Sequence, residues 1–148
     1  TYGQMPDWSA DGDWVVYHGC NERGNDCGLW VMRPGGFESA YISTDGSDTS
    51  PRWSPDGSRV VFISTRDGNW ELYVVDVASG VELRLTDDPA TDVAPVWSPD
   101  GRRLAFLSDR GGAWAVYVLD IASDEVRKVI ATGDPYPDPI RERMSWVP

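Results

Sequence analysis

The chain has 148 residues, of which 41% are hydrophobic, so its length and composition suit one globular domain with a sizeable core. Its 13 Lys and Arg against 24 Asp and Glu give a formal net charge of −11. This excess of acid argues against a nucleic-acid partner, because a phosphate-binding surface needs clustered cations. No apolar run approaches the roughly 18 residues of a membrane helix, so we expect no membrane span.

Three segments of the chain repeat one motif, in which Pro-x-Trp-Ser is followed by Pro or Ala and then by Asp-Gly. They are Pro6–Gly12, Pro51–Gly57 and Pro95–Gly101. From Trp8 to Trp53 is 45 residues, and from Trp53 to Trp97 is 44. A period of this length is typical of proteins in which each repeat is one supersecondary unit that buries its apolar face only against its neighbours.

The second repeat shows the content of one unit. The β-branched and aromatic run Arg59–Ser64 has the length of a strand and lies between two turn-forming sequences, Pro-Asp-Gly and Arg-Asp-Gly. Glu71–Val77 predicts the next strand, and Val81–Thr86 alternates apolar with polar residues as a half-exposed outer strand does. With a short strand around Trp53, the unit has four antiparallel strands, which is a propeller blade.

We therefore predict an all-β chain that forms part of a β-propeller, with three blades of four antiparallel strands. The predicted blades cover about residues 6–50, 51–94 and 95–140, and residues 141–148 predict one extra inner strand. Three blades do not close a ring, since propellers have about four to eight. We expect a second copy of the chain, or further sequence of a longer polypeptide, to complete the ring and cover the open blade faces.

Cys20 and Cys27 are the only cysteines, and they flank a predicted hairpin tip in the first repeat. This placement allows a disulfide across the turn, which an oxidising compartment favours, or two free thiols. A metal site is disfavoured, because only His18 is available to join the cysteines and a zinc site needs about four ligands.

The motif Pro-x-Trp-Ser-Pro-Asp-Gly, followed by a β-run, Ser-x-Arg-x-Gly and an aliphatic-Tyr-aliphatic strand, resembles the TolB-type β-propeller repeat. The match is strong over Pro51–Val75 and Pro95–Leu119, whereas the first repeat departs from it at Ala10, at Trp30 and in its cysteine-bearing insertion. The resemblance implies a binding platform for proteins or the gating propeller of a serine peptidase, and an extracytoplasmic location. Because the family also includes sugar-polymer lyases and metal-binding propellers, it predicts the fold better than the activity.

An aspartate stands five positions before the repeat tryptophan in two repeats, at Asp48 and Asp92. The segment that enters an inner strand faces the central channel of a propeller, so these carboxylates are candidate ligands of a hard cation such as Ca²⁺. In the alternative interpretation, each Asp accepts backbone N–H bonds of its own loop. Gly3 and Arg141 occupy the equivalent places in the flanking repeats and interrupt the ring of carboxylates.

Two arginines, Arg66 and Arg110, lie at the predicted tip of the second hairpin in their repeats. Each could bridge to a carboxylate of a neighbouring blade or meet an anionic ligand. The sequence contains no Gly-x-Ser-x-Gly, no phosphate-binding glycine loop and no His-Glu-x-x-His, and His18 is its single histidine. We therefore predict no catalytic residue and no required cofactor.

These observations favour a non-catalytic scaffold that binds a protein or a small ligand at the mouth of the channel. We expect a protein partner or self-association into a homo-oligomer to complete the ring, and the loops 86–94 and 131–140 to supply specificity. The rival hypothesis is the propeller portion of a serine peptidase or polysaccharide lyase whose catalytic residues lie outside this chain. A scaffold stabilised by Ca²⁺ is the third hypothesis.

Overall fold

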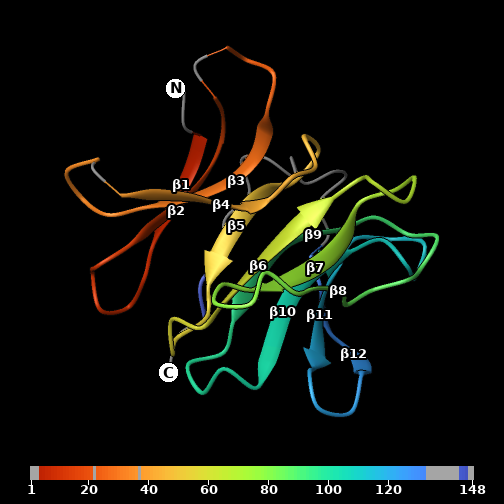
Figure 1. Cartoon of the computed structure of the whole chain (residues 1–148). Helices are drawn as coiled ribbons and strands as arrows, with labels where there is room; N and C mark the ends of the chain where they lie inside the picture. Colours follow the sequence, from red (N-terminus) through yellow and green to blue (C-terminus); the bar gives the residue numbers. More distant parts are fainter. Residues whose placement is uncertain (1–3, 22, 37, 133–143, 147–148) are drawn as a thin grey trace.

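The computed structural model describes residues 4–21, 23–36, 38–132 and 144–146. Across these residues the chain forms strands and no helix (Figure 1). The strands are β1 (Gln4–Trp8), β2 (Val15–Cys20), β3 (Cys27–Met32), β4 (Ser39–Ser43), β5 (Thr49–Trp53), β6 (Arg59–Ser64), β7 (Glu71–Asp76), β8 (Glu82–Arg84), β9 (Asp92–Trp97), β10 (Arg103–Ser108), β11 (Ala115–Asp120) and β12 (Glu125–Ala131). None of the described residues belongs to a helix that could span a membrane.

The strands pair into three four-stranded sheets, each antiparallel and each in chain order (Figure 1). We call the sheet β1–β4 blade 1, the sheet β5–β8 blade 2 and the sheet β9–β12 blade 3. The prediction of an all-β chain with three four-stranded blades is thus confirmed, and the ring that they begin is open. The predicted blade boundaries and the extra inner strand at 141–148 stay predictions, because residues 133–143 and 147–148 lie outside the described part.

Asp-Gly turns, preceded by Pro in blades 2 and 3 and by Ala10 in blade 1, connect the first and second strands of the blades. In blade 2 the Asp56 carboxylate accepts hydrogen bonds from the Ser54 hydroxyl at 2.6 Å and from the Ser58 N–H at 3.0 Å. These bonds lower the pKa of Asp56 to about 2, and the bond from the Ser54 hydroxyl has the largest effect. Gly57 closes the turn with a φ of 71°, a conformation that glycine adopts without steric cost.

The outer strand of blade 2 is shorter than the predicted strand Val81–Thr86. β8 ends at Arg84 although the Leu85 N–H still donates to the Leu72 carbonyl at 2.8 Å, because the Leu72 N–H bonds a side chain rather than a backbone carbonyl. The Thr86 hydroxyl accepts the Leu72 N–H at 2.9 Å, and the Arg84 guanidinium donates to the Thr86 carbonyl at 2.7 Å. The chain therefore leaves the sheet two residues before the predicted strand end.

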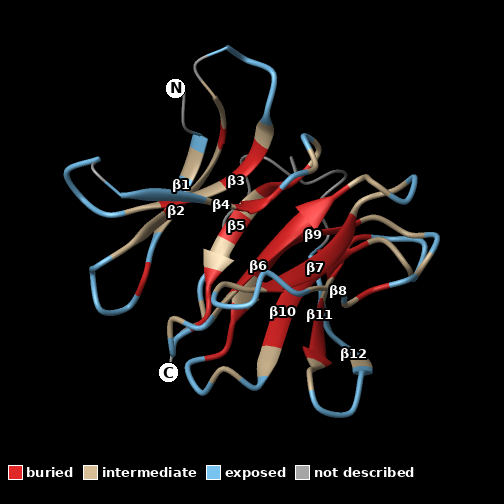
Figure 2. Cartoon of the chain, in the orientation of Figure 1, coloured by how far each residue is buried: buried red, intermediate tan, exposed pale blue. Residues whose placement is uncertain are grey.

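The two faces of each blade differ in composition. In blade 2 the register of the strands places on one face, here named its aromatic face, the residues Trp53, Val60, Phe62, Tyr73 and Val75. The opposite face, named its aliphatic face, carries Val61, Ile63, Leu72 and Val74. All nine side chains are buried, and Figure 2 shows β6 and β7, which carry eight of them, mostly in red.

The blades stack with the aromatic face of one on the aliphatic face of the blade before it. The aromatic face of blade 2 shares one core cluster with Val16, Leu29, Val31 and Ile42 of blade 1. The aliphatic face of blade 2 shares the second cluster with Trp97, Leu104, Phe106, Tyr117 and Leu119, which form the aromatic face of blade 3. The same interface therefore occurs twice in one chain, as a repeat built on stacked units requires.

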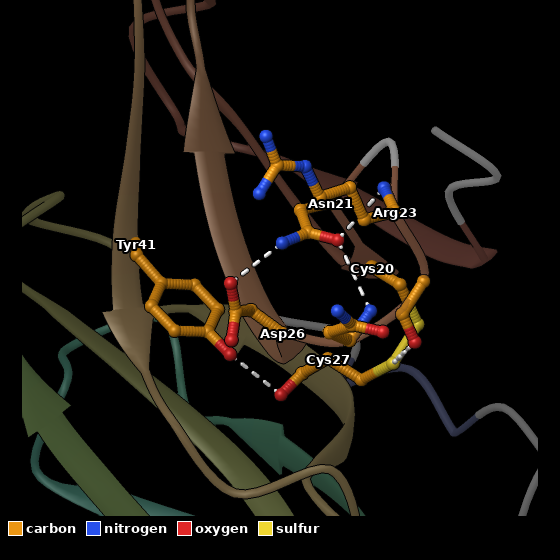
Figure 3. The surroundings of a disulfide bond; sticks show 8 residues. Cys20, Asn21, Arg23, Asp26, Cys27 and Tyr41 are labelled. Atoms are coloured by element: carbon orange, nitrogen blue, oxygen red, sulfur yellow. Dashed lines mark hydrogen bonds between the residues drawn. A yellow bond between two sulfur atoms is a disulfide. The ribbon is translucent and has the colours of Figure 1, made fainter.

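Blade 1 carries a disulfide between Cys20 and Cys27, which face each other across the pair β2–β3 (Figure 3). The Tyr41 hydroxyl donates to the Cys27 carbonyl at 2.6 Å, and the Asn21 side chain donates to the Asp26 carboxylate at 2.5 Å, so β4 and the hairpin tip are both tied to this point. Of the two alternatives that the sequence left open, the structure forms the disulfide.

Candidate binding site at the ends of the inner strands

The inner strands β1, β5 and β9 each end at the repeat tryptophan, and the three strand ends surround one cavity. We call this cavity, which has a volume of about 500 Å³, the basin. Its lining comes from all three blades and from the described C-terminal residues: Asp7, Trp8, Ala10, Arg52, Trp53, Ser54, Pro55, Val96, Trp97, Met144, Ser145 and Trp146. The end of the inner strand, at the repeat tryptophan, thus contributes to the basin in each of the three blades.

Side chains of the basin link each inner strand to the next. The Asp7 carboxylate of blade 1 accepts the Trp53 N–H at 2.9 Å and lies 3.5 Å from the Arg52 guanidinium of blade 2. The Trp97 indole of blade 3 donates to the Arg52 carbonyl at 3.1 Å. These bonds hold the polar groups of the basin in place before any ligand arrives, which lowers the entropy cost of binding.

The hydroxyl of Ser54 lines the basin, but its hydrogen bonds belong to the turn between β5 and β6. Its hydroxyl donates to Asp56 at 2.6 Å and accepts the Arg59 N–H at 2.9 Å. His18, the single histidine, lies on β2 and does not line the basin. The described lining of the basin thus offers recognition groups: a carboxylate paired with a guanidinium among indole rings.

Arginine side chains cover the repeat tryptophans on the neighbouring blade. The Arg59 guanidinium of blade 2 lies 4.9 Å from the ring centre of Trp97 in blade 3. The Arg103 guanidinium of blade 3 lies 5.3 Å from the ring centre of Trp146 in the same way. Trp146 therefore lies against blade 3 as Trp97 lies against blade 2.

The two predicted metal ligands, Asp48 and Asp92, lie at the opposite ends of β5 and β9 from the basin, and both are buried. Asp48 accepts hydrogen bonds from the Ser43 hydroxyl and from the Arg66 guanidinium, the latter at 2.6 Å. Asp92 accepts the Arg110 guanidinium at 2.5 Å. Their partners are side chains rather than the loop N–H groups of the alternative interpretation.

Of the two alternatives for the arginines, the structure forms bridges to carboxylates: Arg66 bonds Asp48, which directly precedes β5, and Arg110 bonds Asp92, the first residue of β9. Both carboxylates lie at the end of the range predicted for the preceding blade, although Asp92 pairs in the sheet of blade 3. The tip of each second hairpin folds back over the start of the inner strand, which brings Arg66 to Asp48 and Arg110 to Asp92. Arg66 also reaches blade 1, through a bond to the Ser43 hydroxyl at 3.4 Å. We call the pairs Asp48–Arg66 and Asp92–Arg110 the carboxylate clamps.

Blade 1 has a different closure at the corresponding hairpin, since the Cys20–Cys27 disulfide crosses β2–β3 where the other blades carry a clamp. One oxygen of each clamp carboxylate, Oδ1 of Asp48 and of Asp92, is buried without a hydrogen-bond partner among the described residues. In the same part of the chain no three Asp, Glu, His or Cys side chains gather as a metal-ligand group. Ca²⁺ binding at Asp48 and Asp92 stays a prediction.

Glu71 is a buried carboxylate that the sequence analysis missed. It accepts the Arg84 guanidinium at 3.1 Å and the Asp88 N–H at 3.0 Å, and it is hydrogen-bonded to the Thr86 hydroxyl. These bonds position the first part of the loop 86–94, which we expect to supply specificity. The equivalent residue of blade 3 is Ala115, so no repeated pattern marks this carboxylate.

Asp92 predicts a pH dependence of stability. Burial raises its pKa from 3.8 to about 6, and the bonds to Ser108 and Arg110 oppose this effect. Between pH 3.8 and about 6 the folded chain therefore keeps a proton that the unfolded chain has lost, so the contribution of Asp92 to stability falls as the pH rises through this range.

Asp92→Asn removes this contribution. Between about pH 4 and 6 the free energy of unfolding should therefore decrease by about 1–3 kcal/mol less in the variant than in wild type. Urea unfolding of both proteins at several pH values measures the two slopes. Equal slopes would show that Asp92 titrates alike in the folded and unfolded chains.

The comparisons with known proteins agree with this geometry. The family model described as the TolB beta propeller domain matches residues 4–143. The chain belongs to this family. Among curated relatives, a protein TolB homolog of Chlorobium luteolum is 34% identical over 76 residues, which is 51% of this chain and 17% of that protein. An uncharacterized peptidase of Bacillus subtilis, YuxL, is 46% identical over 63 residues, 41% of this chain and 10% of that protein.

Among solved structures, the crystal structure of TolB from Acinetobacter baumannii matches this TolB-type propeller with a TM-score of 0.79 and 25% identity. The match covers 89% of this chain and 33% of that one. The chain thus spans less than a fifth of the two curated relatives and about a third of the solved TolB. The resemblance inferred from the Trp-Ser-Pro-Asp-Gly motif is confirmed at the level of the family and the fold.

Proposed function

We propose that this TolB-type propeller segment is a non-catalytic binding and assembly scaffold, with the basin as its recognition site for a polypeptide segment of a partner. The observation that carries the proposal is the convergence of three inner-strand ends on one cavity of about 500 Å³. A preformed ion pair of Asp7 with Arg52 lies there beside the indole of Trp8, which is 57% exposed. Exposed Trp and partly exposed Arg are the side chains that contribute most at protein interfaces.

The location and the ring follow from the same proposal. The Cys20–Cys27 disulfide supports an extracytoplasmic compartment, since disulfides persist where the environment is oxidising. Other polypeptide, from a partner, a longer chain or a second copy, completes the ring that the three blades begin. The proposed scaffold requires no cofactor. The predicted binding of Ca²⁺ by the carboxylates of Asp48 and Asp92 would add stability to its fold.

A peptide selection tests the proposal. We expect a library of random peptides displayed on phage to yield binders of the immobilised chain that lose at least about tenfold in affinity for Arg52→Gln. Leu83→Ala is the control, because Leu83 is exposed on the outer strand β8, far along the sheet from the inner strand β5. Isothermal titration measures each affinity. Binders that hold equally well to Arg52→Gln, or no binders at all, would contradict the basin as a recognition site.

A second candidate is favoured by the identity of 46% over 63 residues with a protein named a peptidase. In this case the segment is part of a peptidase propeller, and the catalytic residues lie on polypeptide outside the chain. The same selection separates the two, since a propeller that only covers a catalytic domain has no need of a peptide site at the basin. Enrichment of basin-directed peptides therefore supports the scaffold, and its absence supports the peptidase propeller.

A further inference from the structure

The aromatic face of blade 1 is less buried than the same face of the other blades: Trp8 is exposed, and the other residues of the face are half-buried. Register places on it Trp8, Val15, Tyr17, Trp30, Met32 and Tyr41. Trp8 is 57% exposed, whereas its equivalents Trp53 and Trp97 are 7% and 6% exposed. Tyr17 is half-buried, whereas its equivalents Phe62 and Phe106 are fully buried. Figure 2 shows the contrast, with the strands of blade 1 mostly tan and pale blue.

The interfaces within the chain define what fits such a face. The aromatic face of blade 2 is covered by the aliphatic face of blade 1, and that of blade 3 by the aliphatic face of blade 2. Each contact adds the indole of the repeat tryptophan, which in blade 3 donates to the Arg52 carbonyl and lies beneath the Arg59 guanidinium. A partner that repeats the blade 2–blade 3 contact offers blade 1 an aliphatic sheet face, an inner-strand carbonyl and a guanidinium at the start of the second strand. The blade 1–blade 2 contact lacks the last two, since the Trp53 indole N–H is buried without a hydrogen-bond partner among the described residues and Trp14 stands at the place of Arg59.

Blade 3 offers all three features at the other end of the chain. The residues equivalent to the aliphatic face of blade 2 are Ala105, Leu107, Val116 and Val118. Arg103 corresponds to Arg59, and the Val96 carbonyl corresponds to the Arg52 carbonyl. The two ends of the arc thus carry the two complementary halves of the interface that occurs twice inside it.

The blade 3 half is largely covered within the subunit: Ala105, Leu107 and Val118 are 7%, 6% and 5% exposed, and the described C-terminal residues contact this half. Met144 packs against the core cluster and Trp146 lies beneath Arg103. A cavity of about 360 Å³ nevertheless separates this segment from Val96, Ala105 and Val116. Residues 144–146 form no strand, so they occupy the place of a repeat tryptophan without supplying a blade.

We propose that two copies of the chain associate head to tail, with the aromatic face of blade 1 of each copy on the aliphatic face of blade 3 of the other. Trp8 of one copy replaces Trp146 beneath Arg103 of its partner and donates its indole N–H to the partner's Val96 carbonyl. Both interfaces form in one closed pair, which is a ring of six blades. The inference rests on the proposed assembly role and names a second copy as the occupant of the open face.

Sedimentation equilibrium over a range of concentrations tests the inference on the 148-residue chain. The buffer contains at least about 0.15 M salt, because two copies of net charge −11 repel each other. We expect a dimer whose dissociation constant rises at least about 30-fold in Trp8→Ala, as removal of a central Trp does at an interface. Leu83→Ala removes a side chain of similar exposure from an outer strand and should change the constant less than about twofold.

A third variant tests the exchange of tryptophans. Trp146→Ala frees the site beneath Arg103 and should strengthen the dimer, whereas a Trp146 that stays in place would make the variant neutral or weaker. A chain that is monomeric up to about 1 mM, a dimer insensitive to Trp8→Ala, or a Trp146→Ala dimer no tighter than wild type would overturn the inference. A monomer that still binds basin-directed peptides would reject the dimer alone and leave the proposed function standing.

Discussion

Arg66→Met is expected to lower the free energy of unfolding by about 3–5 kcal/mol near pH 7. The Arg66 guanidinium is bonded to Asp48, which has no exposed surface, and to Glu82. It also lies 4.7 Å from the ring centre of Tyr73, so its methylene stem and head both fill the blade. Methionine keeps part of the packing but leaves the buried Asp48 carboxylate without its cation, and an unpaired buried charge is the costly outcome.

Two further variants separate the lost charge pair from lost packing. The double variant Arg66→Met, Asp48→Asn should recover at least half of the loss, because it removes the unpaired charge. Arg33→Met is the matched control: Arg33 bonds Glu38 at 2.7 Å and lies 4.7 Å from the Trp14 ring centre, but both partners in this ion pair are exposed. Its cost should stay within about 1 kcal/mol.

Urea unfolding monitored by tryptophan fluorescence gives all of these values, and a pH series adds a second check. Burial raises the pKa of Asp48, against the opposing effect of Arg66. Without the arginine the carboxyl is protonated more readily, so the cost of Arg66→Met should shrink as the pH falls towards the pKa of Asp48. A loss below about 1 kcal/mol at pH 7 would contradict the clamp as a stabilising element.

Phe62→Ala is expected to cost about 3–5 kcal/mol, whereas Tyr17→Ala at the equivalent position of blade 1 should cost no more than about 1.5 kcal/mol. Phe62 is fully buried between blades 1 and 2 and stacks on Tyr73 with ring centres 5.7 Å apart. Tyr17 lies on the open face and has no blade against it. The two positions share strand and register, and each side chain pairs with an aromatic residue of the third strand, Tyr73 in blade 2 and Trp30 in blade 1. The difference in cost therefore reports mainly the packing of one blade on another.

The comparison is made by urea unfolding at a protein concentration that keeps the chain monomeric, because the proposed dimer would bury Tyr17. Phe106→Ala repeats the test in blade 3, where the ring is fully buried and stacks on Tyr117 with ring centres 6.0 Å apart. A loss for Tyr17→Ala as large as that for Phe62→Ala would mean that blade 1 is covered within the subunit.

The strands and turns could be predicted because each is signalled locally and the signals recur. Arg59–Ser64 was predicted with the bounds that the structure shows for β6, since a β-branched run between Asp-Gly turns leaves little choice of register. The outer strand of blade 2 ended two residues early because the Leu72 N–H bonds the Thr86 hydroxyl instead of a backbone carbonyl, a tertiary effect that the local pattern does not carry.

The partners of the candidate site were harder to predict than its residues. Asp48 and Asp92 were selected as channel-facing ligands, but the hairpin tips return over the inner strands of their own blades and bring Arg66 and Arg110 to them. One signal was present: Asp and Arg are 18 residues apart in both repeats. Glu71 occurs once, with Ala115 in its place in blade 3, so no comparison between repeats could reveal it.

The stacking of aromatic on aliphatic faces is tested most directly by a double-mutant cycle between Leu29→Ala in blade 1 and Phe62→Ala in blade 2. The two residues are distant in sequence and share one buried cluster, so we predict a coupling of about 1 kcal/mol or more in the unfolding free energy. The cycle of Tyr17→Ala with Phe62→Ala serves as the control, since Tyr17 lies on the other face of blade 1, and it should be additive. Additive losses for Leu29 and Phe62 would contradict the stacked-blade arrangement on which the site and the proposed assembly depend.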